Sequence, residues 1–213
     1  MARRDNLPRR GTPAAARKRV VDKIPLIPRF LIVCEGTQTE PGYFKQFRVP
    51  GNVVKIDVIG TGLNTIQVVQ KALDKKQQAR DPYDRVWCVF DRDSFPEKHF
   101  NDALDLAREY DIQVAYSNPA FELWFVLHYD SRTSCISRQQ YANRLSVLLR
   151  RPYQKNDRDL YTILKEREPQ AIKHAEALLP PQGARDPAND NPSTTVHLLV
   201  QELRNAAQRP WER

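Results

Sequence analysis

The sequence predicts an α/β fold, in which flanking helices cover a parallel β-sheet and a helical C-terminal half follows. Two apolar runs, FLIVC at 30–34 and VWCVF at 86–90, have the length and the β-branched and aromatic content of buried strands. Strands that are apolar on both faces belong to parallel sheets covered on both sides. The third observation is that strand and helix patterns alternate up to about residue 117, which is typical of β-α-β units with right-handed crossovers.

Four strands and three helices are predicted in the first part of the chain. Apolar runs or alternating patterns place the strands at 30–34, 53–59, 86–90 and 112–116. Pro41 fits the first turn of a helix that runs to about Phe47, and we expect Thr39 to cap it. Asn64 or Thr65 caps the next helix. The second and third helices are predicted to end near residues 78 and 109, the third starting near residue 96.

Beyond residue 117 the pattern becomes helical. Helices are predicted at 119–129, 137–149, 158–165, 169–179 and 194–207, with a loop rich in Pro, Asp and Asn at 180–192. The chain therefore divides into an N-terminal arm (1–28) and one domain (29–213). That domain consists of an α/β core (29–117) and a helical part (118–213).

Most of the net charge of +8 lies in the N-terminal arm. Its proline, glycine and alanine content predicts disorder in the free protein. A basic arm is a common feature of nucleic-acid-binding proteins, and a solubilising leader is an equally good interpretation. The residues expected to contact nucleic acid are Arg3, Arg4, Arg9, Arg10, Arg17, Lys18 and Arg19.

Composition predicts a cytoplasmic protein without a membrane segment. No run is long and apolar enough to span a bilayer, and the basic N-terminus lacks the apolar stretch of a secretory signal. Cys34, Cys88 and Cys135 have neither disulfide nor zinc spacing. Cys34 and Cys88 fall in predicted buried strands, which argues against thiol nucleophiles.

Carboxylates follow two of the predicted buried strands directly. Glu35 comes after the first strand, and Asp91 and Asp93 come after the third. The carboxyl ends of parallel strands meet at one edge of a sheet, where ligands bind, so these side chains are expected to converge. Mg²⁺ prefers oxygen ligands of this kind. The alternative for Asp91 and Asp93 is capping of the following helix.

Further candidates lie on either side of these carboxylates. Glu122 falls in an apolar stretch, where a metal, lysine or arginine is expected as its partner. Lys155 is a candidate for stabilising transition-state charge, with an ordinary exposed lysine as the alternative. His128 is expected to be a packing residue, and Gly60 to belong to a turn. Glu40 is favoured near a helix N-terminus by the helix dipole alone.

Five blocks of the sequence resemble the RloB-like family. They are VCEGTQTEPGYF at 33–44, VFDRD at 89–93, SNPAFELW at 117–124, YQKN at 153–156 and NPSTTV at 191–196. Together they extend in order from about residue 29 to residue 203, and the basic arm lies outside them. The resemblance implies a Toprim-like (Rossmann-like) catalytic fold with a glutamate after one strand and Asp-x-Asp after another, which here are Glu35, Asp91 and Asp93.

The resemblance also implies a function in defence against phages or mobile DNA. The first hypothesis is a Mg²⁺- or Mn²⁺-dependent endonuclease with a slight preference for RNA, including tRNA-like targets. Asp91 and Asp93 would hold the metal, Glu35 would complete the site or act as base, and Glu122 and Lys155 would assist. A regulatory protein of a defence locus and a second copy of the chain are the protein partners considered. The alternatives are a non-catalytic binding subunit and a nucleotidyl transferase.

Overall fold

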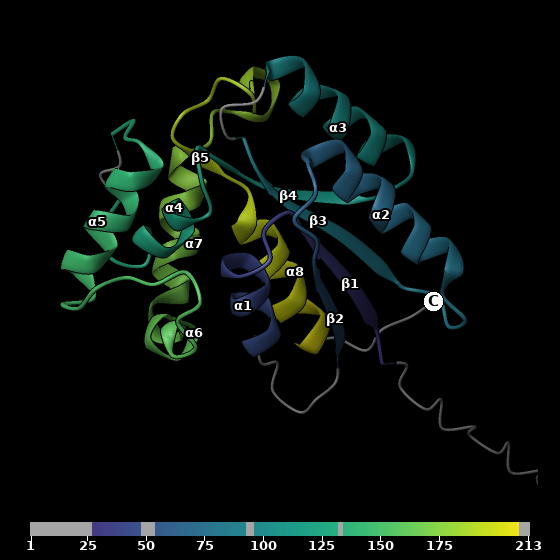
Figure 1. Cartoon of the computed structure of the whole chain (residues 1–213), viewed down its shortest axis with the longest axis horizontal. Helices are drawn as coiled ribbons and strands as arrows, with labels where there is room; N and C mark the ends of the chain where they lie inside the picture. Colours follow the sequence, from purple (N-terminus) through teal and green to yellow (C-terminus); the bar gives the residue numbers. More distant parts are fainter. Residues whose placement is uncertain (1–26, 48–53, 93–95, 132–133, 209–213) are drawn as a thin grey trace, which may run out of the picture.

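The computed structural model describes residues 27–47, 54–92, 96–131 and 134–208 (Figure 1). Almost all of the N-terminal arm, including every basic residue assigned to it above, lies outside these ranges, as does Asp93. The description that follows concerns the domain that carries the predicted carboxylates.

A mixed five-stranded sheet forms the centre of the domain, in the order β2-β1-β3-β4-β5. Strands β1 to β4 pair in parallel, which confirms the predicted parallel core. Strand β5 pairs antiparallel with β4 and places Thr194 opposite Ser117. The strands are β1 (Arg29–Cys34), β2 (Lys55–Gly60), β3 (Arg85–Asp91), β4 (Gln113–Asn118) and β5 (Ser193–Thr194).

Strand β5 was not predicted, because two residues are too few to show a periodic pattern. The prediction that helix begins at residue 194 was wrong by two residues. Tertiary contacts hold this segment in the sheet: the Thr195 backbone N–H donates to the Tyr116 carbonyl at 2.9 Å, and the Ser117 and Thr194 hydroxyls lie 2.9 Å apart.

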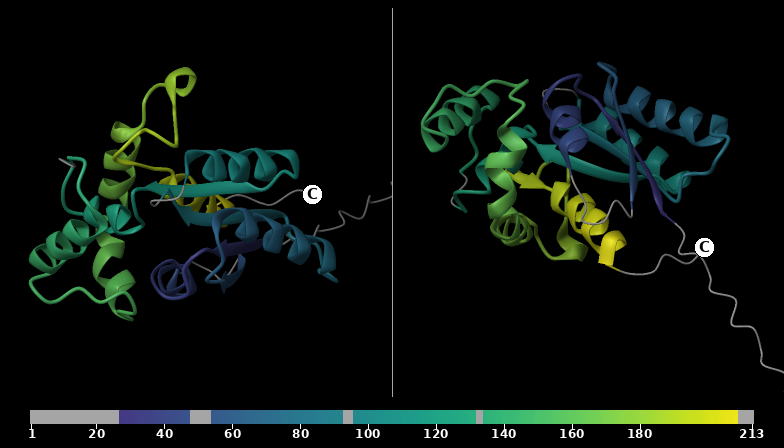
Figure 2. Two further views of the ribbon diagram at one scale, coloured as in Figure 1. Left: turned by 45° about the horizontal axis from the view of Figure 1, so that its top comes forward. Right: turned by 90° about the horizontal axis from the view of Figure 1, so that it is seen from below.

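Helices cover both faces of the sheet (Figures 1 and 2). Alternate β1 side chains enter two separate cores, as strand geometry requires. Leu31 and Val33 pack with α2 and α3, whereas Phe30, Ile32 and Cys34 pack with α1 and α8. The covering helices are α1 (Thr39–Gln46), α2 (Thr65–Gln78), α3 (Glu97–Glu109) and α8 (Val196–Gln208).

The remaining helices lie beyond the carboxyl end of β4, on the left in Figure 1. They confirm the predicted helical C-terminal half. They are α4 (Glu122–Val126), α5 (Arg138–Leu148), α6 (Leu160–Leu164) and α7 (Glu168–Leu178), with 3-10 turns at Lys165–Arg167 and Gln182–Ala184. Within the described ranges, no helix is long and apolar enough to cross a membrane.

Two local predictions were wrong. The N-cap of α1 is Gln38, and Thr39, which was expected to be the cap, is already the first helical residue. The N–H groups of the first helical turn have no partner within the helix, so proline is tolerated at any position there and Pro41 does not show where α1 begins. The helix expected at 119–129 shrinks to α4. Leu123 and Trp124 donate to carbonyls three residues back, which is the tighter 3-10 pattern. A mostly apolar run shows no helical period that would locate the ends of a helix.

Several predictions about packing are confirmed. Asn64 caps α2 through a capping box, and Cys34 and Cys88 are buried. His128 is buried beside Trp124, whose carbonyl lies 2.9 Å from its Nδ1. Burial lowers the pKa of His128 to about 4, so the imidazole is neutral near pH 7. It is a packing residue, as expected.

Candidate functional site

Carboxylates gather beyond the carboxyl ends of β1, β3 and β4. Glu35 follows β1, Asp91 ends β3, and Glu122 begins α4 shortly after β4. A cavity of about 390 Å³ lies here between the sheet edge and the helical part. It is lined by Gly36, Thr37, Gln38, Thr39, Glu40, Asp91, Phe121, Glu122, Arg138 and Lys155.

Glu35 and Asp91 meet directly, at the sheet edge where the sequence places them. The Asp91 backbone N–H donates a hydrogen bond to Glu35 Oε2 at 3.1 Å, and the Glu35 N–H donates to the Val89 carbonyl at 2.8 Å. These contacts continue the pairing of β1 with β3 by one residue past the strand end. The sheet itself therefore brings the two acidic residues together.

Asp91 lies in an environment that disfavours its charge. The residue is 8% exposed, and Arg138 donates from Nη2 to its Oδ2 at 2.7 Å. Its other oxygen, Oδ1, is buried without a hydrogen-bond partner in the described structure. Burial, followed by the negative charge of Glu40, raises the pKa of Asp91 well above its usual range, and Arg138 opposes this shift. An unpaired carboxylate oxygen on a residue that lines a cavity fits a cation as its partner.

Glu40 belongs to the same cluster, which the sequence interpretation missed. It is 6% exposed in the first turn of α1. Burial raises the pKa of Glu40, and the charge of Glu122 adds to the shift, whereas backbone hydrogen bonds oppose it. A side chain favoured only by the helix dipole would remain in solvent. Glu40 lies five residues after Glu35, across the turn at Gly36, and this short spacing could have placed it in the carboxylate cluster.

Glu122 has a partner of a different kind from those expected. The residue is 3% exposed, and the Tyr153 hydroxyl donates to its Oε1 at 3.2 Å. Burial and then the charge of Glu122 raise the pKa of Tyr153, so the phenol keeps its proton and remains a donor. In the described structure a tyrosine hydroxyl is therefore a partner of Glu122, and the metal, lysine or arginine expected from the sequence stays a prediction. Tyr153 opens one of the motifs quoted above.

Two basic side chains from the helical part line the cavity. Lys155 is exposed, lies in the loop between α5 and α6 and lines the cavity; its role in stabilising transition-state charge stays a prediction. Arg138 is the first residue of α5, which Ser137 caps through a capping box. Sequence reasoning missed Arg138, because no local pattern links it to Asp91, 47 residues away.

These residues provide only some of the ligands that a metal ion needs. Among the described residues, no group of three or more His, Cys, Asp or Glu is arranged to hold an ion. Mg²⁺, however, is usually held by one or two carboxylates together with waters and substrate phosphates. Asp91, with its unpaired oxygen, and Glu35 meet that smaller requirement. Asp93, the third expected ligand, lies outside the described ranges.

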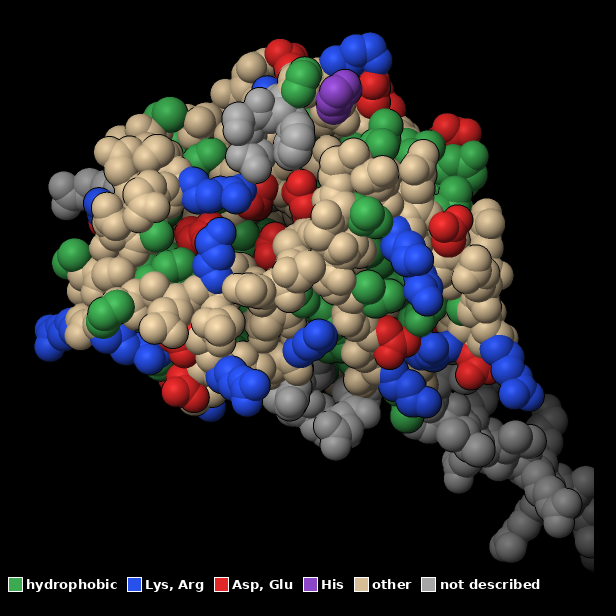
Figure 3. All heavy atoms as spheres, in the orientation of Figure 1, with side chains coloured by type: hydrophobic (Ala, Val, Ile, Leu, Met, Phe, Trp, Pro, Cys, Tyr) green, Lys and Arg blue, Asp and Glu red, His purple; other side chains and the backbone are tan. Residues whose placement is uncertain are grey.

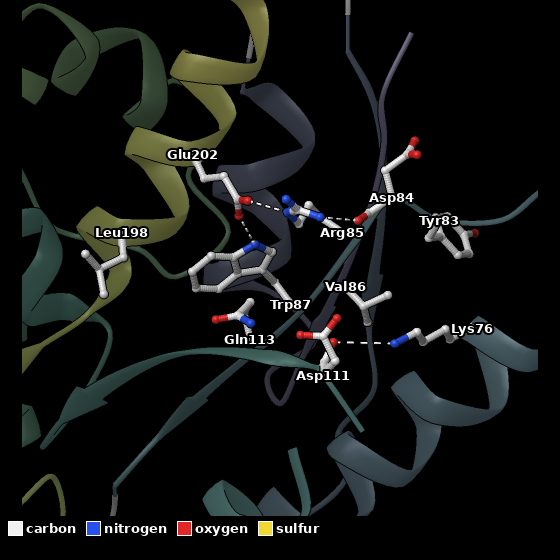
Figure 4. A pocket seen from close by; sticks show the side chains of 10 residues that line it. All are labelled: Lys76, Tyr83, Asp84, Arg85, Val86, Trp87, Asp111, Gln113, Leu198 and Glu202. Carbon is white, nitrogen blue, oxygen red and sulfur yellow. Dashed lines mark hydrogen bonds and ion pairs between the residues drawn. The ribbon is translucent and has the colours of Figure 1, made fainter. Parts of the chain in front are cut away.

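A larger cavity, of about 610 Å³, opens at the opposite edge of the sheet, where β3 and β4 begin (Figure 4). Its polar groups largely satisfy one another. Glu202 accepts hydrogen bonds from Trp87 Nε1 and Arg85 Nε, each at 2.7 Å, and Lys76 donates to the Tyr110 carbonyl at 2.9 Å. In contrast with Asp91, none of these groups indicates a missing ligand.

We expect Gly60 to be required for the geometry of the loop after β1. A Cβ on Gly60 would lie 2.8 Å from the Gly36 carbonyl oxygen and 2.9 Å from Pro41 Cγ, so the Gly60→Ala variant must displace the backbone beside Glu35. The expected cost is about 1–3 kcal/mol in the free energy of unfolding, measured by urea denaturation.

Gly42→Ala is the matched control for Gly60→Ala. A Cβ on Gly42, in α1, has nothing within 4 Å, and alanine is the better helix former. This variant should be neutral or more stable by up to about 1 kcal/mol. Equal stabilities for the two variants would contradict the assigned role of Gly60.

Comparison with known proteins gives one result. A model of the RloB-like protein family matches residues 30–203, which include all of β1 except its first residue, β3, β4, the carboxylate cavity and most of α8. The comparisons with curated proteins and with solved structures each gave no match. The family match covers every described residue of the site, including Glu35, Asp91, Glu122 and Lys155. The chain belongs to the RloB-like protein family.

Proposed function

We propose that this protein is a Mg²⁺- or Mn²⁺-dependent nuclease of the Toprim type that cleaves phosphodiester bonds in defence against phages. The observation that supports this most directly is the buried, unpartnered Oδ1 of Asp91, a residue that lines a cavity together with Glu40 and Glu122 and whose backbone N–H donates to Glu35. Carboxylates buried together repel one another, and a divalent cation relieves that repulsion. A cation would also provide the partner that the Asp91 Oδ1 lacks.

Asp91 and Glu35 would hold the cation, and Asp93 is expected to complete the set. When bound, the cation supplies an activated water and neutralises charge on the phosphate. Glu35 Oε2 already accepts the Asp91 backbone N–H, so its orientation is set before any ligand binds. Preorganised ligands of this kind reduce the cost of assembling the site.

The other residues of the cavity fit two supporting roles. The raised pKa of Glu40 favours its protonated form, which suits a side chain that donates a proton to a leaving oxygen. Arg138 and Lys155 place positive charge at the cavity, where it would stabilise charge on the reacting phosphate. Glu122, held by Tyr153, supports the acidic side of the cavity.

The preference for RNA and the role in phage defence rest on the resemblance of the sequence motifs to the RloB-like family. A regulatory protein of a defence locus as partner rests on the same argument. The acidic cavity itself fits the chemistry of phosphodiester cleavage in either nucleic acid, because the phosphate and the metal requirement are shared.

The test is incubation of the purified chain with total tRNA, single-stranded RNA and plasmid DNA, each with Mg²⁺, Mn²⁺ or EDTA. We expect cleavage that needs the metal and falls at least about a hundredfold in Glu35→Gln. Glutamine keeps an oxygen that can accept the Asp91 N–H but removes the charge. Glu109→Gln, at an exposed position of α3, is the matched control and should cleave normally.

Two outcomes would contradict the proposal. The first is the absence of cleavage of any substrate with either metal, which would favour the non-catalytic binding subunit. The second is cleavage that persists in EDTA or in Glu35→Gln.

A further inference from the structure

Positive charge is unevenly distributed outside the N-terminal arm. Residues 138–167 contain eight arginines and lysines but three acidic residues, whereas residues 29–131 contain twelve arginines and lysines and fifteen acidic residues. The basic stretch is α5, the loop that follows it, α6 and the adjoining 3-10 turn. A local excess of one sign is the electrostatic feature of a surface that binds a polyanion.

This basic stretch forms one wall of the carboxylate cavity. Arg138, at the start of α5, reaches Asp91 at 2.7 Å, and Lys155 lines the cavity from the loop. Between them in sequence, Tyr153 donates to Glu122 at 3.2 Å. Figure 3 shows acidic side chains in a hollow between the helical part and the sheet, with basic side chains at its border. The surface is therefore continuous with the site.

The loop after α5 is held in place by its own hydrogen bonds. The Tyr153 backbone N–H donates to Ser146 Oγ at 3.0 Å, and Arg151 pairs with Asp157 at 2.5 Å. Asp157 also accepts the Asp159 N–H at 2.9 Å. These contacts fix the backbone that carries Arg150, Lys155 and Arg158, and all three residues are exposed. A surface whose backbone is already ordered loses less entropy when it binds.

We propose that Arg138, Arg150, Arg151, Lys155 and Arg158, here called the basic rim, bind the phosphodiester backbone of the substrate and direct it to Asp91. The choice of a nucleic acid as ligand rests on the proposed function. The basic rim lies in the folded domain and is distinct from the N-terminal arm, to which sequence reasoning assigned all nucleic-acid binding. Guanidinium groups are well suited to phosphate oxygens, because their donors match them in pairs.

The test compares two double variants of the full chain that each remove two positive charges. Arg150→Gln/Arg158→Gln changes the basic rim at exposed positions outside the cavity lining. Lys98→Gln/Arg108→Gln changes α3, where both side chains are nearly 80% exposed and form surface ion pairs that contribute little to stability. Binding of labelled tRNA, single-stranded RNA and duplex DNA is followed by fluorescence anisotropy in EDTA, so that no metal-dependent cleavage interferes.

We expect the rim variant to bind its preferred probe roughly tenfold more weakly at low salt. Loss of two phosphate contacts should also reduce the slope of log K against log salt by about 1.4 for a single strand or 1.8 for a duplex. The α3 variant should retain the wild-type affinity and slope.

Equal effects of the two variants, or the absence of wild-type binding to every probe, would overturn the role of the basic rim. These results are separable from those on the proposed function. Rim-dependent binding without cleavage under any condition would leave the rim in place and refute the nuclease. Cleavage with an unaffected rim variant would refute the rim alone.

Discussion

Replacement of Asp91 by asparagine is expected to abolish metal-dependent cleavage while leaving nucleic-acid binding intact or stronger. Asparagine is close in shape and can still accept the Arg138 hydrogen bond through its carbonyl oxygen. It removes a charge that both binds the cation and repels phosphate. Loss of groups that only support a metal ligand costs about 10–100-fold, so loss of the ligand itself should cost at least a hundredfold.

The same variant should stabilise the metal-free protein at neutral pH. The pKa of Asp91 is raised on folding, so the native state binds more protons than the unfolded state between the unfolded pKa, about 3.9, and the raised value. Wild-type stability therefore falls as pH rises through that interval. In Asp91→Asn this loss is absent, and the new NH₂ group takes the place of the unpaired Oδ1.

Thermal unfolding in EDTA at pH 4 and pH 7.5 checks this expectation. The variant should unfold at least about 2 °C above the wild type at pH 7.5, the shift that 1 kcal/mol produces in a chain of this length. The difference should be much smaller at pH 4, where the native carboxyl is largely protonated and about half of the unfolded-state aspartate is protonated as well. A variant less stable than the wild type at pH 7.5 would show that Asp91 is a structural partner of Arg138 instead of a strained ligand.

Replacement of Glu168 by alanine should cause a large loss of stability, about 3 kcal/mol. Glu168, 6% exposed at the start of α7, accepts hydrogen bonds from Arg204 of α8 at both oxygens, at 2.7 and 2.8 Å. Arg204 also donates to the Tyr161 hydroxyl at 3.2 Å and lies over the Phe47 ring. Breaking a buried pair costs about 3–5 kcal/mol, and partial exposure of Arg204 places this case at the lower end.

Urea denaturation of Glu168→Ala and Glu166→Ala measures this effect with an internal control. Glu166 lies two residues away, is 84% exposed on its side chain and approaches Lys165 at 4.0 Å, so its removal should change stability by less than about 0.5 kcal/mol. The double variant Glu168→Leu/Arg204→Leu should lose less stability than the sum of the losses in Glu168→Leu and in Arg204→Leu, each measured alone. In the double variant no unpaired charge is left buried. Additive costs would contradict a coupled pair.

Part of the site was predictable because it depends on strand ends. The runs before Glu35 and Asp91 are apolar on both faces, which identifies them as buried strands of a parallel sheet. The carboxyl ends of such strands share one edge of the sheet, and the direct pairing of β1 with β3 brings these two ends together. The cap at Asn64 and the burial of Cys34 and Cys88 follow from similarly local rules. The membership of Asp93 in the site remains a prediction.

Other parts depend on distant segments and left no local pattern. Arg138 contacts Asp91 across 47 residues, and Tyr153 contacts Glu122 across 31. Strand β5 exists because Ser193 and Thr194 meet the end of β4, about 75 residues earlier in the chain. The helix dipole alone explained why a glutamate occurs at position 40, so there was no reason in the sequence to expect that Glu40 is buried in the cavity.

The sequence by itself determined the α/β class, the order of strands and helices along the chain and the edge of the sheet at which Glu35 and Asp91 meet. These follow from hydrophobic period and from the polarity of parallel strands, which are properties of short segments. Only the tertiary structure decided which groups surround those carboxylates and which basic surface adjoins them. Packing of the helical part onto the sheet edge sets the distances from Arg138, Lys155 and Tyr153, and such distances are absent from any local pattern.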